Sequence, residues 1–260
     1  MHYGYDGSYA GLLSLLYQLF RNRRQPANIH PPSAAQNSSL FPPEQHSCEP
    51  RQADALLIQV RRHLGAAVEC QLRHAFLSRR PGIELQLYHY LALGWRLRQR
   101  LDDQLTHPAV RSVHQAARFT QHEVHRFKGL LRFAHCQLAD NPAGLYYGRC
   151  RPDADIIALL APHFRRRLAG QQWLIEDVGR QTAILCDGQH WALGQLSLQQ
   201  PAAASDEELQ WQALWRTFHH HSAIPERRNP RLQRQFLPLK YREFLCELQP
   251  SATVEPESWS

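Results

Sequence analysis

The stretch WLIEDVGRQTAILCDGQHWALGQL, residues 173–196, decides the fold class that the sequence predicts. It contains three short runs of apolar, aromatic or β-branched residues separated by turn residues. Asp187 and Gly188 separate the last two runs, and an Asp-Gly pair is a strong hairpin signal because it accepts the backbone angles of a tight two-residue turn. Together with the earlier run LYYGRC at 145–150, these residues predict a small antiparallel β-meander.

Outward from this stretch, the pattern is mainly helical. From residue 53 to about residue 139 apolar side chains recur at helical spacing, and the last helix of this region is expected at about 107–139. Asp6 or Ser8 is expected to cap a helix that runs to residue 20, and further helices are expected at 153–168, 205–221 and 230–247. A short N-terminal strand can join the meander. The predicted fold class is α+β, mainly helical with a small antiparallel β-meander.

The length of 260 residues suits one large domain or two small ones, and we expect a single domain over residues 1–248. A segment at about 25–50 carries six prolines and little apolar periodicity, which is typical of a mobile loop or insertion. Residues 249–260 are expected to form a disordered tail. Six cysteines without a C-x-x-C pair disfavour a disulfide framework or a zinc knuckle. The longest apolar run, at 11–20, is too short to cross a bilayer, so we expect a cytoplasmic protein with no membrane partner.

The charge balance points to a phosphate-bearing partner. The chain has 30 basic and 23 acidic residues, which gives a net charge of +7. All basic residues except Lys128 and Lys240 are arginines, whose planar guanidinium group suits bidentate phosphate contacts. A genome biased towards GC-rich codons produces the same arginine excess, so composition alone does not identify the partner.

The stretch HEVHRFKGLLRF at 122–133 is one residue short of the zinc-protease signature H-E-x-x-H. On a helix, Glu123 points away from the two histidines and no third ligand follows, so we expect no metal and no cofactor. A solvated amphipathic face and a phosphate-binding surface both remain open. Gly129 lies within the basic stripe of this helix, where close approach of another backbone or close helix packing would explain a glycine. The basic stripe of this helix consists of Arg118, His122, His125, Lys128 and Arg132.

A second concentration of arginine lies at 216–242, where seven basic residues stand against Glu226, with Glu243 directly after the range. Part of it surrounds a predicted helix start, where exposed backbone amides also favour an anion. A solvated charged helix explains the same pattern. FRRRL at 164–168 is a weaker third patch and is more simply a helix end. The candidate nucleic-acid-binding residues are therefore Arg118, His125, Lys128, Arg132, Arg227, Arg228, Arg231 and Arg234.

Signals for catalysis are sparse, because the sequence has no nucleophile elbow, P-loop or dinucleotide-binding glycine motif. Asp6 and Asp177 lie near predicted turns and strand ends, and they are the weak candidates for a general base. A helix cap explains Asp6 more simply. The sequence thus leaves open whether the protein is a non-catalytic nucleic-acid-binding subunit, a DNA-processing enzyme of the hydrolase or base-excision type, or a scaffold for an acidic protein partner.

Four segments in the same order resemble a bacterial family of uncharacterised DNA-metabolism and DNA-repair proteins. They are YDGSYAGLL at 5–13, HRFKGLLRF at 125–133, LLAPHFRRRLAGQQWLIEDVGRQTAILCDG at 159–188, and LWRTFHHHSAIPERRNPRLQRQFLPLKYREFL at 214–245. That family is associated with radical-SAM proteins, and some relatives carry a uracil-DNA-glycosylase-like domain. The chain stops at residue 260, so no such domain is expected here.

The resemblance implies a nucleic-acid-binding accessory subunit that works on DNA with a radical-SAM protein as partner. This sequence has no CxxxCxxC motif, so radical chemistry would belong to the partner. In the family a tryptophan follows the last tyrosine, whereas Arg242 follows Tyr241 here, which puts an aromatic contact at that point in doubt. The positions that match the family are Asp6, His125, Lys128, Gly129, Arg132, Asp177, Arg227, Arg228, Asn229, Pro230 and Arg231.

Overall fold

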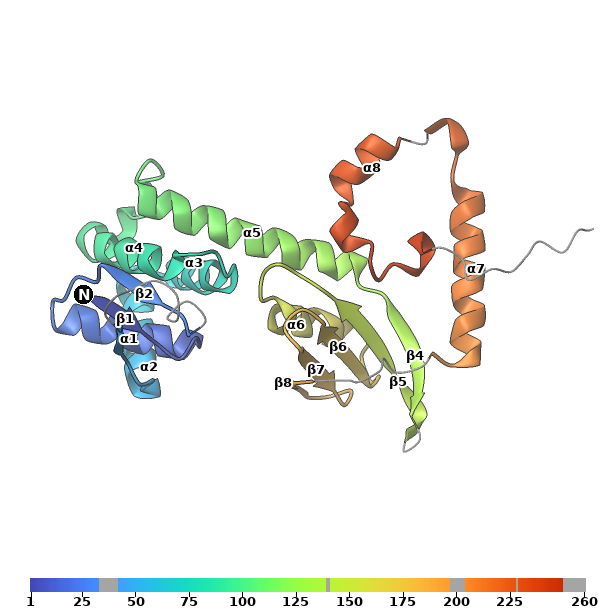
Figure 1. Cartoon of the computed structure of the whole chain (residues 1–260), viewed down its shortest axis with the longest axis horizontal. Helices are drawn as coiled ribbons and strands as arrows, with labels where there is room; N and C mark the ends of the chain where they lie inside the picture. Colours follow the sequence, from blue (N-terminus) through green and yellow to red (C-terminus); the bar gives the residue numbers. More distant parts are fainter. Residues whose placement is uncertain (33–41, 139–140, 197–203, 228, 250–260) are drawn as a thin grey trace, which may run out of the picture. The chain divides into compact units, whose positions relative to one another are not determined.

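The structure is a computed structural model, and it describes residues 1–32, 42–138, 141–196, 204–227 and 229–249 (Figure 1). These residues form eight α-helices and two sheets, which confirms the predicted α+β, mainly helical class. Packing divides the described chain into two compact units. The predicted single domain over 1–248 stays a prediction. Across the described residues, no helix is both long and apolar enough to cross a membrane.

The first unit comprises Met1–Glu123 and Asp153–Asp155. Its small sheet is parallel, with the strand order β2-β1-β3. The N-terminal strand therefore does not join the meander, because its partners come from the proline-rich segment; residues 33–41 of that segment lie outside the described residues. The elements are β1 (His2–Gly4), α1 (Tyr9–Arg21), β2 (Asn28–His30), β3 (Glu44–Gln45), α2 (Pro50–His63), α3 (Ala66–Leu77), α4 (Ile83–Leu97), a short 3-10 turn (Arg98–Arg100) and the start of α5 (Pro108–Leu130).

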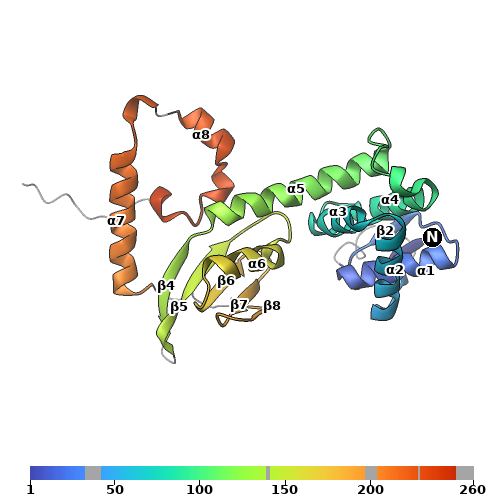
Figure 2. The same cartoon turned by 180° about the vertical axis from the view of Figure 1, so that it is seen from behind.

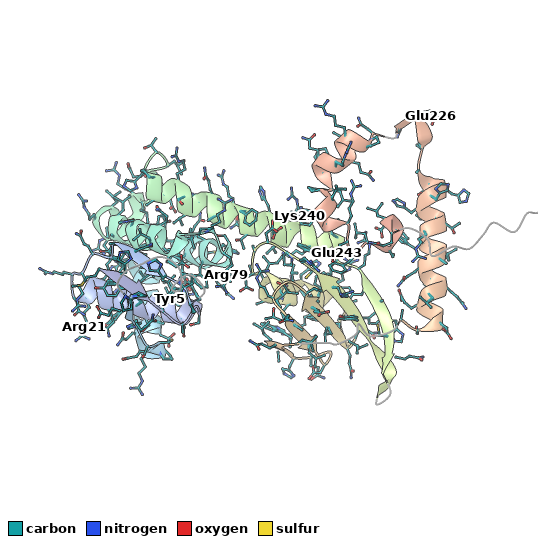
Figure 3. The ribbon with its side chains drawn as sticks, in the orientation of Figure 1. Tyr5, Arg21, Arg79, Glu226, Lys240 and Glu243 are labelled. Carbon is teal, nitrogen blue, oxygen red and sulfur yellow. The ribbon has the colours of Figure 1, made fainter. Side chains whose placement is uncertain are left out.

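Polar contacts tie the edges of the first unit to its hydrophobic core. The hydroxyl group of Tyr5 donates to the buried carboxylate of Glu84 at 3.1 Å. Burial and the neighbouring charge of Glu84 both raise the pKa of Tyr5, so this hydroxyl stays protonated. Arg79 donates to Gly7 O at 3.3 Å and pairs with Asp155 at 2.8 Å; Figure 3 labels Tyr5 and Arg79. These contacts hold the loop 153–155 in the first unit.

The second unit contains Val124–Pro152 and the described residues from Ile156 onward. Its five-stranded sheet has the order β4-β5-β6-β7-β8 and is mixed, since β5 and β6 are parallel while the other neighbours are antiparallel. The purely antiparallel expectation is wrong at this pair, because α6 connects β5 to β6 and brings the chain back in the same direction. The elements are β4 (Phe133–Leu138), β5 (Asn141–Cys150), α6 (Ile157–Arg167), β6 (Trp173–Asp177), β7 (Thr182–Cys186) and β8 (Trp191–Gln195).

The long helix α5 ends earlier than its sequence pattern predicts. It stops at Leu130, and the chain then enters β4 at Phe133. Backbone hydrogen bonds of the β4–β5 hairpin replace the helical ones, because Cys136 and its neighbours bury their apolar side chains only in the sheet. The prediction of a helix to residue 139 is thus wrong, and Arg132 lies after the helix.

The C-terminal part of the second unit consists of the 17-residue helix α7 followed by shorter helices joined by turns (Figure 2). The expectation of a helix over 230–247 is also wrong, since regular helix covers only Pro230–Phe236. Pro238 lacks an N–H group and cannot continue the helical hydrogen bonding, so tighter turns follow. The elements are α7 (Asp206–Ser222), η2 (Pro225–Arg227), α8 (Pro230–Phe236), η3 (Leu239–Tyr241) and η4 (Cys246–Leu248).

Candidate nucleic-acid interface

A groove of about 860 Å³ lies within the second unit, between α7 and the strands β4 and β5. Its polar and aromatic lining comes from five separate stretches of the chain. Residues near the end of α6 and the segment 244–249 complete it. The lining residues are Leu131, Arg132, Phe133, Ala134, Tyr146, Tyr147, Arg149, Arg167, Leu168, Glu208, Trp211, Gln212, Trp215, Arg216, Phe244, Cys246 and Gln249.

Hydrogen bonds at the start of α7 hold this wall of the groove against β4. Ser205 caps the helix by accepting from Glu208 N at 3.2 Å. The backbone N–H of Ser205 donates to His135 O at 3.0 Å, and His135 N donates to the carboxylate of Glu208 at 3.1 Å. The first turn of α7 is therefore fixed to the edge strand.

Two of the groove arginines have carboxylate partners. Arg132 donates to Glu247 at 2.7 Å and to Gly129 O at 2.9 Å. Arg149 lies 3.6 Å from Glu176 and stacks over the Phe244 ring at 4.9 Å. These two guanidinium groups are mainly structural, because their charges are compensated.

The other two groove arginines are bound differently. Arg167 donates to Lys128 O at 3.5 Å, and Arg216 donates to Cys246 O at 3.1 Å. Among the described residues, neither forms an ion pair with a carboxylate. A carbonyl orients a guanidinium group without neutralising it, so both side chains keep a full positive charge for an anionic ligand.

Exposed aromatic side chains accompany these arginines. Trp211 is 60% exposed and Trp215 is 41% exposed, although both line the groove. None of the side chains of helix α7 is buried. The apolar stripe to which Trp211 and Trp215 belong therefore stays exposed. Phe218 extends the stripe, since its ring lies 5.7 Å from the Trp215 ring. Indole rings beside unpaired guanidinium groups can contact both bases and phosphates.

The floor of the groove is held by buried hydrogen bonds. The hydroxyl group of Tyr147 donates to the carboxylate of Glu176 in a short hydrogen bond. Burial raises the pKa of Tyr147, and the neighbouring carboxylate raises it further. Burial opposes ionisation of Glu247, but hydrogen bonds from Arg132 and Trp215 outweigh this and lower its pKa. The groove therefore has a fixed base on which α7 and residues 244–249 rest.

The residues of the first predicted patch belong partly to the first unit and partly to the second. Arg118 is exposed on the part of α5 that belongs to the first unit. His125 is exposed and Lys128 is half-buried on the part that belongs to the second unit. Of this patch, only Arg132 lines the groove. Val124 and Phe127 of the same helix are buried.

Except for Arg216, which lines the groove, the second predicted patch lies elsewhere in the second unit. Arg227 lines a separate cavity of about 900 Å³ between α7 and α8. Arg231 and Arg234 are exposed on α8, and Arg228 lies outside the described residues. Beyond α8, Lys240 lies 4.8 Å from the Tyr241 ring (Figure 3). Arg132 of the first patch and Arg216 of the second thus line the same groove, whereas Arg227 lines the separate cavity and Arg231 and Arg234 line neither.

The two carboxylates considered as general bases have other partners. Asp177 is fully buried, pairs with Arg180 at 2.8 Å and accepts from Gly179 N at 3.0 Å. Asp6 accepts from both the N–H and the hydroxyl group of Ser8. Neither lines the groove, and a catalytic role for either stays a prediction. Nowhere in the described chain do three or more His, Cys, Asp or Glu side chains form a group suited to a metal ion.

Sequence reasoning missed most of the groove. Arg132, Arg167 and Arg216 stood in predicted basic patches, whereas Arg149 and the two tryptophans were not singled out. A usable signal existed in α7, because Trp211 and Trp215 are four residues apart and share a face with Phe218. No pattern indicated that this face would line a groove together with β5, since the two elements are far apart in the sequence.

The fold and the groove define an α+β protein with a basic, aromatic-lined surface in its second unit. Residues 81–247 match the family described as a domain of unknown function (DUF4130), and the match covers more than half of the chain. The chain belongs to this family. Of the groove lining, only Gln249 lies beyond the matched residues. No curated protein matches the chain, and no solved structure matches it either.

Proposed function

We propose that the groove of the second unit binds nucleic acid and that the protein serves as an accessory subunit in DNA repair or DNA metabolism. The supporting observation is that Arg167 and Arg216, with uncompensated charges, line the same groove as Trp211 and Trp215. Guanidinium groups attract phosphates, and indole rings stack on bases. A nucleic acid presents both groups along one chain.

Charge favours this ligand over an uncharged one. Glu208 is the one acidic side chain among the residues that line the groove, and it is tied to the backbone of β4. An apolar ligand would remove Arg167 and Arg216 from water without giving them an anionic partner, which costs free energy. A phosphate backbone supplies the missing anions.

The DNA setting and a radical-SAM partner are proposed from the sequence resemblance. Co-expression with a radical-SAM protein encoded beside this chain, followed by gel filtration after nuclease treatment, tests the partnership. Co-elution without nucleic acid supports a direct complex. Separate elution contradicts the partnership but does not affect the proposal that the groove binds nucleic acid.

Charge reversal tests the groove directly. The variant R167E/R216E is expected to weaken binding to a fluorescently labelled oligonucleotide by at least about tenfold, because it removes both uncompensated guanidinium groups. The control R231E/R234E makes the same charge change on exposed α8, outside the groove. Fluorescence anisotropy at low salt measures both affinities. An equal loss in the two variants, or a loss only in the control, contradicts the proposal.

A further inference from the structure

We infer that the ligand of this groove is an unpaired nucleic-acid strand whose bases stack on Trp211 and Trp215. This inference rests on the proposed function and specifies its substrate class. It stands on the exposure, spacing and anchoring of the two indole rings, together with the neighbouring arginines.

The two rings are arranged as successive platforms along one helix. A separation of four residues places them about 6 Å apart along the axis and about 40° apart around it. Each indole ring is held at its edge by a carboxylate. Trp211 Nε1 lies 3.5 Å from the carboxylate of Glu207, and the Trp215 side chain forms a hydrogen bond with Glu247. Both side chains stay partly exposed while their positions are restrained, and the Phe218 ring stacks against that of Trp215. This suits stacking, which needs an accessible face at a fixed place.

An unpaired strand fits these platforms better than a duplex. In a duplex the flat faces of the bases are covered by their neighbours, and only base edges and phosphates are accessible. Unpaired bases offer their faces, and stacking on aromatic side chains works for every base. Arg216 follows Trp215 directly and Arg167 lines the same groove, so phosphates between stacked bases would meet both guanidinium groups.

An apolar segment of a partner protein is the competing occupant of the stripe. Leu214 and Phe218 share it and are 58% and 60% exposed. Such a segment would cover the tryptophans but would bring no anion to Arg167 and Arg216. Charge complementarity therefore favours the nucleic acid, and the choice of substitution can separate the two occupants.

The variant W211L/W215L keeps apolar side chains but removes the aromatic faces. We expect it to bind a labelled oligothymidine at least about fivefold more weakly for each tryptophan lost, and to bind a duplex of equal length as the wild type does. W211F/W215F should recover part of the affinity. W191L is the matched control, because Trp191 is 38% exposed on β8 and lies outside the groove. Circular dichroism verifies that each variant is folded.

The outcomes separate this inference from the proposed function. If wild-type protein binds neither strand form, both fail. If R167E/R216E loses binding while W211L/W215L binds oligothymidine normally, only the inference is overturned. The inference is also overturned if W211L/W215L loses equal affinity for the single strand and the duplex. It is overturned as well if a partner protein shields the two tryptophans while oligothymidine binding is unchanged. A selective loss of single-strand affinity supports it.

Discussion

Gly11 determines how the first helix begins. Asp6 accepts from Ser8, and the Ser8 hydroxyl in turn accepts from Gly11 N at 2.8 Å. A Cβ atom on Gly11 would overlap the Asp6 carboxylate, which the Ser8 backbone N–H already holds at 2.9 Å. The sequence predicted a cap at Asp6 or Ser8, and the structure uses both, with Ser8 as the capping residue.

Substitution of Gly11 should therefore depend on Asp6. We expect Gly11→Ala to lower the free energy of unfolding in the wild type, because the carboxylate must leave its place. In the Asp6→Ala background the same change should raise it by up to about 1 kcal/mol, since alanine favours a helix over glycine. Urea unfolding of the four proteins measures both effects. Equal effects in the two backgrounds would show that Asp6 does not constrain this position.

At the scale of single elements, Gly129 near the end of α5 has no steric reason to be glycine. A Cβ atom there would meet nothing within 4 Å. Gly129→Ala should thus stabilise the protein by roughly 0.5–1 kcal/mol through helix propensity. Gly148→Ala is the contrasting control, because its Cβ atom would lie 3.1 Å from the Phe133 ring and should destabilise the hairpin. If Gly129→Ala weakens oligonucleotide binding while it raises stability, a ligand approaches this backbone.

The elements predicted correctly are those with strong local signals. The strands β6, β7 and β8 follow from their apolar runs, and Asp187 forms the expected turn by accepting from Gln189 N and His190 N. The end of α5 and the parallel pairing of β5 with β6 were not predicted. The first depends on the β4–β5 hairpin, which competes with the helical pattern, and the second on a strand that follows only after α6. The groove was missed for the same reason. Its arginines and tryptophans come from separate elements, and only folding brings them together.

At the scale of the whole molecule, the family match crosses the boundary between the two units. It begins at residue 81 in the first unit and continues through the described elements of the second. Helix α5 also belongs to both units, with Glu123 in one and Val124 in the other. The proposed ligand contacts, in contrast, all lie within the second unit. The net charge of +7 belongs to the whole chain, so it can attract a polyanion without any groove.

Salt dependence distinguishes these two modes of binding. Two to four phosphate contacts in the groove should give a slope of log K against log salt of about −1.4 to about −3 for a single strand, whereas neutralisation of all seven net charges should give about −5. Fluorescence anisotropy with labelled oligothymidine between low and physiological salt measures the slope. R167E/R216E should flatten it by about 1.4, and R231E/R234E should leave it unchanged. A steep slope that both variants reduce equally would assign binding to the overall charge of the molecule, because each variant changes that charge by the same amount.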